Sequence, residues 1–249
     1  MSTLWRVGLG SSLIILLVGL WEVAARAGWI NFRIFGQPSR IWSRAVTEFQ
    51  GPIWPHITAT LSEIALALSL AIAIGGTIGV LMGWYRIVSR ALDVTITIWM
   101  AFPIIAALPV IVAWFGIGFQ IPVIIVFTTT VFPTIVTTAA GVRTVNPDLV
   151  RMARHLGATD SHILRTIALP TALAYLVAGV RVAIGRAVGV VVVGEWLGSP
   201  YGLGSMTFSA FQNFKIDLAL LGATTMAVLG ITLTAVARMI ERRFSAWRT

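Results

Sequence analysis

Six long apolar segments follow one another along the chain, separated by shorter polar stretches. They cover about Val7–Ala25, Thr58–Trp84, Val94–Phe115, Ile121–Val142, Thr171–Val193 and Leu218–Ile240. Each is long enough to cross a hydrocarbon core of about 30 Å as a helix. Lipid offers no hydrogen-bond partner to an exposed backbone, so only helices are expected there. The pattern therefore predicts an all-α membrane protein with six transmembrane helices, the first of which is retained rather than cleaved.

The composition supports a membrane protein and excludes several other classes. Of the 249 residues, 57% are hydrophobic and only 11% are charged, whereas soluble domains carry about 25% charged residues. There is no cysteine, so neither disulfides nor thiolate metal sites are possible. The net charge of +9 could suggest nucleic acid as a partner, but the basic residues fall mostly between the apolar segments. We therefore expect no nucleic acid partner.

The distribution of basic residues predicts the orientation. One side of the membrane receives Arg6, Arg86, Arg90, Arg143, Arg151, Arg154, Arg165, Arg238, Arg242, Arg243 and Arg248. The other receives Arg26, Arg33, Arg40, Arg44 and Lys215. The richer side is expected to be cytoplasmic. Both termini are then cytoplasmic, in a multi-pass protein of the inner membrane that contacts lipid.

Further signals divide the chain into an N-terminal unit, residues 1–57, and a core, residues 58–249. In the outer loop, Ile41, Trp42, Ala45, Val46 and Phe49 recur at helical spacing, which indicates an amphipathic helix at the outer interface. The second span carries overlapping GxxxG patterns at 75–79 and 79–83. Such glycines let two helix backbones approach closely, within or between subunits.

The loop of residues 143–170 is unusually long for a connection between spans. Asn146 is a suitable N-cap, Pro147 suits the first helical position, and Gly157 can end the helix in a left-handed conformation. The helix carries an apolar stripe made of Leu149, Met152, Ala153 and Leu156. A second helix is expected to follow, capped by Thr159 or Asp160.

The apolar stripe needs something to cover it. The lipid surface, the cytoplasmic ends of the chain's own helices and a groove on another protein are all possible from the residues alone.

The stretch RMARHLGATDSHILRTIALP (151–170) resembles the cytoplasmic signature of permease subunits of bacterial ATP-binding-cassette (ABC) importers, in the sulfonate/nitrate/taurine branch. That signature runs roughly E-A-A-x-x-x-G, then about nine residues, then I-x-L-P. The matching residues are Ala153, Gly157, Ile167, Leu169 and Pro170, whereas Arg151 and Met152 stand where the family usually has Glu and Ala. Similar segments are FGIG (115–118), AGVRTVNPDL (140–149), GVRVAIGRA (179–187) and GEWLGSPYGLG (194–204).

The resemblance implies the type I (MetI-like) importer permease fold, with the loop as a coupling helix between spans 4 and 5 that docks into an ATPase subunit. The implied coupling residues are Arg151, Met152, Ala153, Arg154, His155, Leu156, Gly157, Ala158 and Thr159. It also implies a homodimer of permeases, a dimer of ABC ATPase subunits that binds ATP and magnesium, and an extracytoplasmic solute-binding protein. The transported solute is expected to be a small anion such as a sulfonate, taurine or nitrate.

The chain has no signal for catalysis of its own. It contains no phosphate-binding G-x-x-x-x-G-K-[ST], and its one lysine, Lys215, lies outside any such loop. His56, His155 and His162 form no i, i+4 metal pair. We therefore expect no catalytic residue, no metal and no cofactor in this chain. A secondary carrier and a non-transporting scaffold are the alternative functions; no repeat of the kind common in carriers is evident.

Charged residues within or beside the spans are the remaining candidates. An arginine inside a span is costly unless it faces a polar interior or a partner, so Arg181 and Arg186, together with Glu63, are expected to line the solute path. The competing interpretation is a structural ion pair of Arg181 with Glu63 or Glu195. Glu195, Tyr201, Gly202 and Gly204 lie in the following outer loop, where we expect a gate or a contact for the binding protein.

Overall fold

The computed structural model describes the backbone of residues 3–245 and the side chains of residues 12–241. Apart from connections, this part of the chain is helical, as predicted. The elements in order are α1 (Thr3–Arg26), α2 (Phe32–Phe35), α3 (Pro38–Glu48), α4 (Trp54–Leu70), η1 (Ala71–Gly75), α5 (Gly76–Trp84), α6 (Arg86–Ala101), η2 (Ile104–Ala107), α7 (Leu108–Phe115), α8 (Gln120–Arg143), α9 (Pro147–His155), α10 (Asp160–Ile163), η3 (Leu164–Ala168), α11 (Leu169–Gly198), α12 (Leu203–Gln212) and α13 (Ile216–Ser245).

Four helices in the described part are long and apolar enough to cross a membrane: Trp54–Trp84, Gln120–Arg143, Asp160–Gly198 and Ile216–Glu241. They correspond to the second, fourth, fifth and sixth predicted spans. The first predicted span, Val7–Ala25, falls within α1, although its residues before Ser12 lie outside the part whose side chains are described.

The third predicted span, Val94–Phe115, is not one straight helix. Helices α6 and η2–α7 meet at 73°. Pro103 disfavours helical conformation in the residue before it, and Phe102 accordingly adopts an extended ψ of 124°. The chain therefore breaks at Phe102–Pro103, between two segments that are each too short to span alone.

The second helix expected in the 143–170 loop is also not separate. From Asp160 to Gly198 the chain forms a single helix of 39 residues. Its only irregularity near Pro170 is the π-helical turn η3, in which the Leu169 N–H donates to the Leu164 carbonyl. A π turn is a recognised way to adjust a helix locally, and here it precedes a proline without ending the helix.

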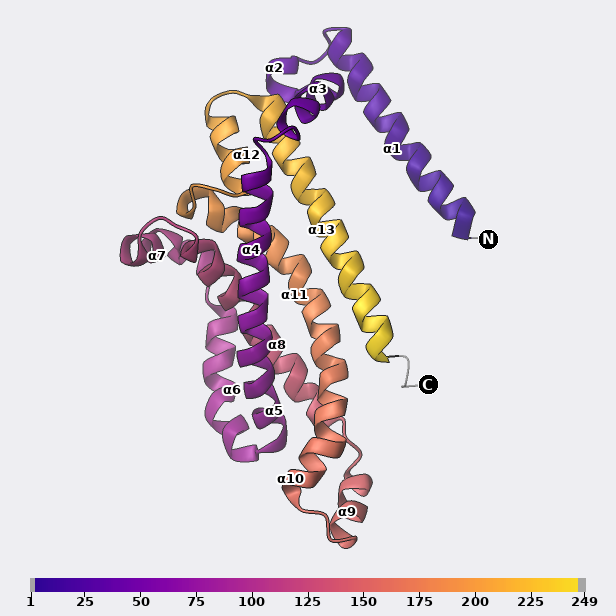
Figure 1. Cartoon of the computed structure of the whole chain (residues 1–249), viewed down its shortest axis with the longest axis vertical. Coiled ribbons are helices and arrows are strands. Elements are labelled where there is room, and N and C mark those ends of the chain that lie inside the picture. The colour runs from indigo at the N-terminus through magenta and orange to yellow at the C-terminus, as the bar shows by residue number, and fades with distance from the viewer. Residues whose placement is uncertain (1–2, 246–249) are drawn as a thin grey trace.

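Helices α8 and α11 form the centre of the bundle, and α4–α5, α6 and α13 pack around them (Figure 1). The glycines of the GxxxG patterns serve this packing within the chain. A Cβ added to Gly79 would lie 2.6 Å from Thr138 Cβ and 2.7 Å from the Ile135 carbonyl oxygen, both on α8. Gly75 and Gly83 approach α8 in the same way.

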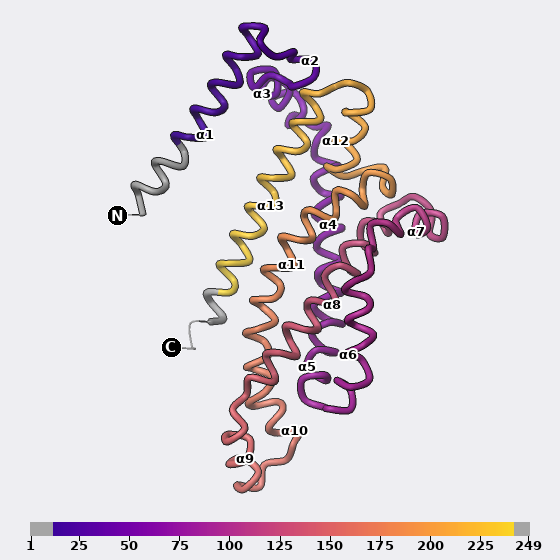
Figure 2. The backbone as a smooth tube through the Cα atoms, turned by 180° about the vertical axis from the view of Figure 1, so that it is seen from behind, coloured from indigo at the N-terminus to yellow at the C-terminus, as the bar shows by residue number. Residues whose placement is uncertain are grey.

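The N-terminal helix stands apart from this bundle. Both views show α1 joined to the rest through α2 and α3 at one end and diverging from α13 toward the other end (Figures 1 and 2). The junction is polar: Glu22 accepts hydrogen bonds from the Gln37 side chain and the Ser39 backbone N–H, each at 3.0 Å, and pairs with Arg26. Helix α3 is the predicted outer amphipathic helix, although Trp42 remains 74% exposed while Ile41 packs on the core.

The two ends of the molecule differ in kind. One carries α2, α3 and α12, and the other carries α9, α10 and the connection between α5 and α6 (Figure 1). Helix α1 runs along the long axis toward the α2–α3 end, and α13 runs back in the opposite direction (Figure 2). The described parts of α1 and α13 therefore direct both chain ends toward the side that bears α9.

The close contact of α5 with α8 predicts a specific sensitivity. Gly79→Ala would place a methyl group against the α8 backbone and is expected to destabilise the fold by about 1–3 kcal/mol. Thermal unfolding of the purified protein in nanodiscs measures this. Gly19→Ala is the matched control, because a Cβ there meets nothing within 4 Å. Equal melting temperatures for the two variants would contradict the close contact.

Candidate functional site

Helix α9 begins and ends as its sequence predicts. The Asn146 side chain accepts a hydrogen bond from the Asp148 N–H at 2.8 Å, and Pro147 occupies the first turn. Gly157 has a φ of +84°, the left-handed conformation that commonly ends helices. Thr159, one of the two predicted caps, begins the next helix by accepting from the His162 N–H at 3.3 Å.

The apolar stripe of α9 is not covered by the rest of the chain. Leu149, Met152 and Leu156 are 50%, 60% and 82% exposed, while Ala153 is half-buried. Helix α9 packs against α10 and projects from the end of the bundle (Figure 1). Three possible partners for the apolar stripe were considered from the sequence. The ends of the chain's own helices, which were one of them, therefore do not cover it.

Two exposed salt bridges lie in the segment around α9. Arg151, where the family usually has Glu, pairs with Asp148 one turn earlier on the same helix. Arg154 reaches across the Gly157 turn to Asp160, with its Nη2 3.0 Å from Oδ1. His155, Gly157 and Thr159 are exposed, and Ala158 is half-buried. All nine predicted coupling residues thus lie in one projecting segment.

At the opposite end, two residues predicted for different roles meet in one buried cluster. Glu63 on α4 and Glu195 on α11 are both fully buried, and Glu63 Oε2 has no hydrogen-bond partner among the described residues. Thr60 donates to Glu195 Oε1 at 2.6 Å, and the Gly204 N–H donates to Oε2 at 2.5 Å. Ser199 Oγ lies 3.3 Å from Glu63 Oε1.

The cluster connects α4, α11 and the start of α12. Thr60 also accepts from the Leu203 N–H at 2.9 Å, so one hydroxyl links α4 to both other helices. A Cβ at Gly202 or Gly204 would collide with the Glu195 side chain, which explains the small residues there. Buried carboxyl groups need such donors because an unsatisfied one is strongly destabilising.

The outer loop between α11 and α12 is held by the same region. His56 Nδ1 lies 2.9 Å from the Gly202 carbonyl oxygen, and Ser199 donates to the Tyr201 carbonyl at 2.7 Å. The Tyr201 side chain is 58% exposed. Of the four residues predicted for the outer gate, Tyr201 therefore faces outward, whereas Glu195, Gly202 and Gly204 form the support beneath it.

The two arginines of α11 have different surroundings. Arg181 Nη1 lies 2.8 Å from Glu241 Oε2 on α13, so its ion-pair partner is neither Glu63 nor Glu195, the two acids considered from sequence. Arg186 is exposed and forms no ion pair with any residue among 12–241. It lines a cavity of about 210 Å³ between α6, η2, α8 and α11.

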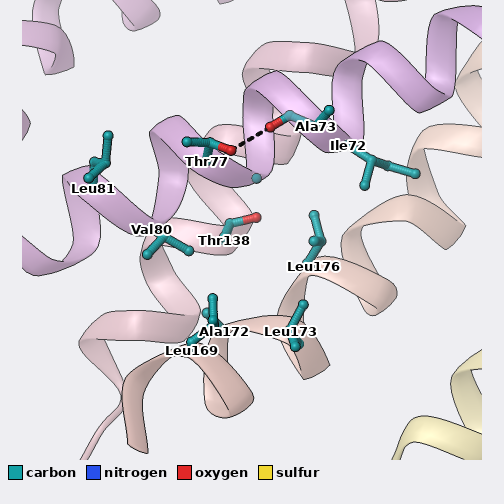
Figure 3. A pocket seen from close by; sticks show the side chains of 11 residues that line it. Ile72, Ala73, Thr77, Val80, Leu81, Thr138, Leu169, Ala172, Leu173 and Leu176 are labelled. Atoms are coloured by element: carbon teal, nitrogen blue, oxygen red, sulfur yellow. Dashed lines mark hydrogen bonds between the residues drawn. The ribbon is translucent and has the colours of Figure 1, made fainter. Parts of the chain in front are cut away.

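A second, larger cavity has a different character. It measures about 320 Å³ and lies between η1–α5, α8 and the start of α11. Figure 3 shows Val80, Leu169 and Leu173 among its lining side chains. No charged side chain lines it, and the Thr138 hydroxyl has no hydrogen-bond partner. Such an apolar groove is unsuited to an ion, in contrast to the cavity beside Arg186.

Sequence reasoning missed the partners of the buried acids. Thr60 lies one turn before Glu63 on the same helical face, a signal that was present but is common in spans. Ser199 and His56 are brought to the cluster by tertiary packing alone, 136 residues from Glu63 and 146 residues from Gly202 in sequence. Among the described residues, no three His, Asp or Glu gather as a metal-ligand set.

Comparisons with known proteins agree on the type of protein. The family model for the binding-protein-dependent transport system inner membrane component matches residues 71–246. The taurine transport system permease protein TauC of Escherichia coli (strain K12) is 29% identical, over 97% of this chain and 90% of the relative. The putative aliphatic sulfonates transport permease protein SsuC of the same organism is 27% identical, over 93% and 88%.

A solved structure supports the fold. The chain is similar to one from the MetNI methionine ABC transporter in inward-facing conformations, with a TM-score of 0.69 and 18% identity. The match covers 78% of this chain and 98% of the other. The type I importer permease fold expected from sequence is confirmed on this evidence.

The buried cluster predicts the effect of removing one hydroxyl. Thr60→Val leaves the Leu203 N–H and a Glu195 oxygen without a partner, and each buried unsatisfied group costs about 1–3 kcal/mol. The melting temperature should fall, and amide exchange at Leu203 and Gly204 should accelerate.

Thr58→Val serves as the control for this substitution, because Thr58 is exposed and its hydroxyl bonds only within its own helix. Such a surface change is expected to stay within about 0.5 kcal/mol. Unchanged exchange at Leu203 in Thr60→Val would show that the cluster does not hold α12.

Proposed function

Because the chain belongs to the binding-protein-dependent transport system inner membrane component family, we propose that it is the permease subunit of an ATP-driven importer for a small anion. Its place is the bacterial inner membrane, with α9 and both termini on the cytoplasmic side. The orientation is supported by the basic residues near α9 and by the direction of α1 and α13 (Figure 2).

The projecting α9 carries this proposal. The exposed apolar side chains of Leu149 and Met152 on α9 and of Leu156 at its C-cap are costly in water and suit a hydrophobic groove on another protein. Arg151 and Arg154 are already paired with acids of the same segment, so the segment is pre-shaped for docking. We assign the groove to an ABC ATPase subunit, and residues 151–159 to the contact.

Energy must come from that partner. The chain's one lysine, Lys215, lies in the connection between α12 and α13, at the opposite end from α9 (Figure 1). No phosphate-binding loop can form around it. The permease is therefore a non-catalytic subunit, and ATP and magnesium are bound by the ATPase.

The open face of α11 supports a second copy of the chain. Gly185 and Gly189 have nothing within 4 Å of an added Cβ, and Val182 and Arg186 are exposed beside them. An unpaired arginine facing lipid in the middle of a span costs about 2.5–3.5 kcal/mol. Two copies meeting along this face would enclose the arginines in a polar path.

The solute is proposed to be a small anion. Relatives named for taurine and aliphatic sulfonates and the unpaired Arg186 support this class. Arg181 and Glu63, also expected in the path, are instead engaged with Glu241 and with the outer cluster. An extracytoplasmic binding protein would deliver the solute and contact the outer loop at Tyr201, whose support is the Glu195 cluster.

The docking role of α9 is tested by placing a charge on its stripe. Leu156→Asp should abolish co-purification of the ATPase, because a carboxylate would have to be buried in an apolar groove. The measurement is the ATPase:permease ratio after affinity purification of the tagged permease, together with ATP-dependent uptake in cells.

Ile87→Asp is the matched control, since Ile87 lies at the same end of the molecule and is 83% exposed, compared with 82% for Leu156. It should retain the ATPase. Retention of the ATPase by Leu156→Asp would contradict the docking role, and uptake by the parent protein without any ATPase would favour a secondary carrier.

A further inference from the structure

The cavity beside Arg186 combines several features that a solute site needs. Its walls come from three helices and from the break between α6 and α7. With a volume of about 210 Å³, it is smaller than the about 300–1,000 Å³ typical of sites for drug-sized ligands. Only a compact solute fits.

The backbone around this cavity is irregular at membrane depth. Phe102 and Ile104, on either side of Pro103 in the break, both line it. Non-helical backbone in a bilayer is tolerated only where it is buried in protein or lines an aqueous cavity. Broken helices at mid-membrane are a recurring way to build solute sites.

Arg186 is the main hydrogen-bond donor of the cavity. The hydroxyls of Thr128 and Thr129, which also line it, donate to the carbonyls of Ile124 and Ile125 in their own helix. A guanidinium offers five N–H donors in a planar fork that suits oxyanions. Arg186 lies 12 residues before Gly198, or about 18 Å along the helix, so it is close to mid-membrane.

The wall of this cavity also contains a residue whose backbone can act as a hydrogen-bond acceptor. Pro133 lies inside α8 and has no N–H, so the Thr129 carbonyl lacks its usual helical donor. Pro133 and Thr129 both line the cavity. A carbonyl without that donor can accept a hydrogen bond from an N–H group of a ligand.

An aromatic wall completes the site. Trp99 and Phe132 stack with ring centroids 5.9 Å apart, and Phe102 meets Trp99 edge-on at 5.6 Å. Trp99 and Phe102 remain 45% and 46% exposed. Their surfaces can cover a short carbon chain, and aromatic faces also attract ammonium groups.

We propose that this cavity is the solute-binding site of the permease and takes a compact organic oxyanion that carries an N–H donor at its other end. Arg186 binds the oxyanion, the Thr129 carbonyl accepts from the donor group, and the aromatic wall covers the carbons between them. The inference rests on the proposed transport function and adds to it a site and a class of solute.

The absence of cysteine permits a direct test. Met100 lines the cavity and is 50% exposed, so Met100→Cys introduces a single thiol there. Its modification rate is measured on the purified complex with two methanethiosulfonate reagents, one bearing a sulfonate and one a trimethylammonium group. Arg186 should favour the anionic reagent, and Arg186→Gln should lower the anionic-to-cationic rate ratio by about tenfold.

Two variants make this result specific to the charge of Arg186. Arg186→Lys retains the charge and should retain the ratio. Arg181→Gln removes a charge that lies on the same helix but is paired with Glu241, and it should leave the ratio unchanged. A ratio that is insensitive to Arg186→Gln, or that falls equally in Arg181→Gln, would overturn the site.

The solute class is tested by protection of the same thiol. Among 2-aminoethanesulfonate, ethanesulfonate and 2-aminoethanol, the first should slow the labelling of Met100→Cys most. Equal slowing by the two sulfonates would show that the solute does not need an N–H donor. If neither sulfonate slowed the labelling, the proposal would be overturned. Co-purification of the ATPase with the Met100→Cys parent, measured alongside, shows whether the transport function itself still holds.

Discussion

The structure depends on one constraint: the hydrocarbon core of a membrane offers no hydrogen bonds, so every polar group inside it must find a partner in the protein. Threonine hydroxyls along α8 return to carbonyls of their own helix, as Thr134 does to Thr130 at 2.7 Å. The buried acid Glu195 accepts hydrogen bonds from Thr60 on α4 and from the Gly204 N–H on α12. The break at Phe102–Pro103 lies against a cavity rather than against lipid. Arg186, inside α11, forms no ion pair with any residue among 12–241, which is why it marks the proposed path.

The same constraint distinguishes the buried cluster around Glu195, which is bonded within the chain, from the exposed apolar surface of α9. The cluster around Glu195 is buried, and its hydrogen bonds from Thr60 and the Gly204 N–H connect α4, α11 and α12 within the chain. Helix α9 is the reverse, since its polar groups are satisfied within the segment while its apolar groups are exposed. A surface of this kind is suited to a partner protein, whereas the outer cluster requires none.

Much of the fold followed from sequence because it depends on local rules. Span length located the helices, and the residues Asn146, Pro147 and Gly157 fixed both ends of α9 through capping and a positive φ. The break in the third span was less accessible, because many prolines in spans are absorbed without a break, as Pro133 is here. Partners of charged residues were not predictable at all. Arg181 meets Glu241, 60 positions away, and Glu63 meets Glu195; such pairs arise from packing between helices that no periodicity reveals.

The uninterrupted helix from Asp160 to Gly198 has a mechanical consequence. It is about 58 Å long, and it begins beside α9 and ends next to Glu195 in the outer cluster. A rod of this kind acts as a lever, so tilting at its inner end must displace its outer end in the opposite sense about the contacts with α8. The π turn at Leu164–Ala168 is the point near the inner end where that tilt could be partly absorbed. Movement of α9 would therefore be transmitted along this helix to the Glu195 cluster at its other end.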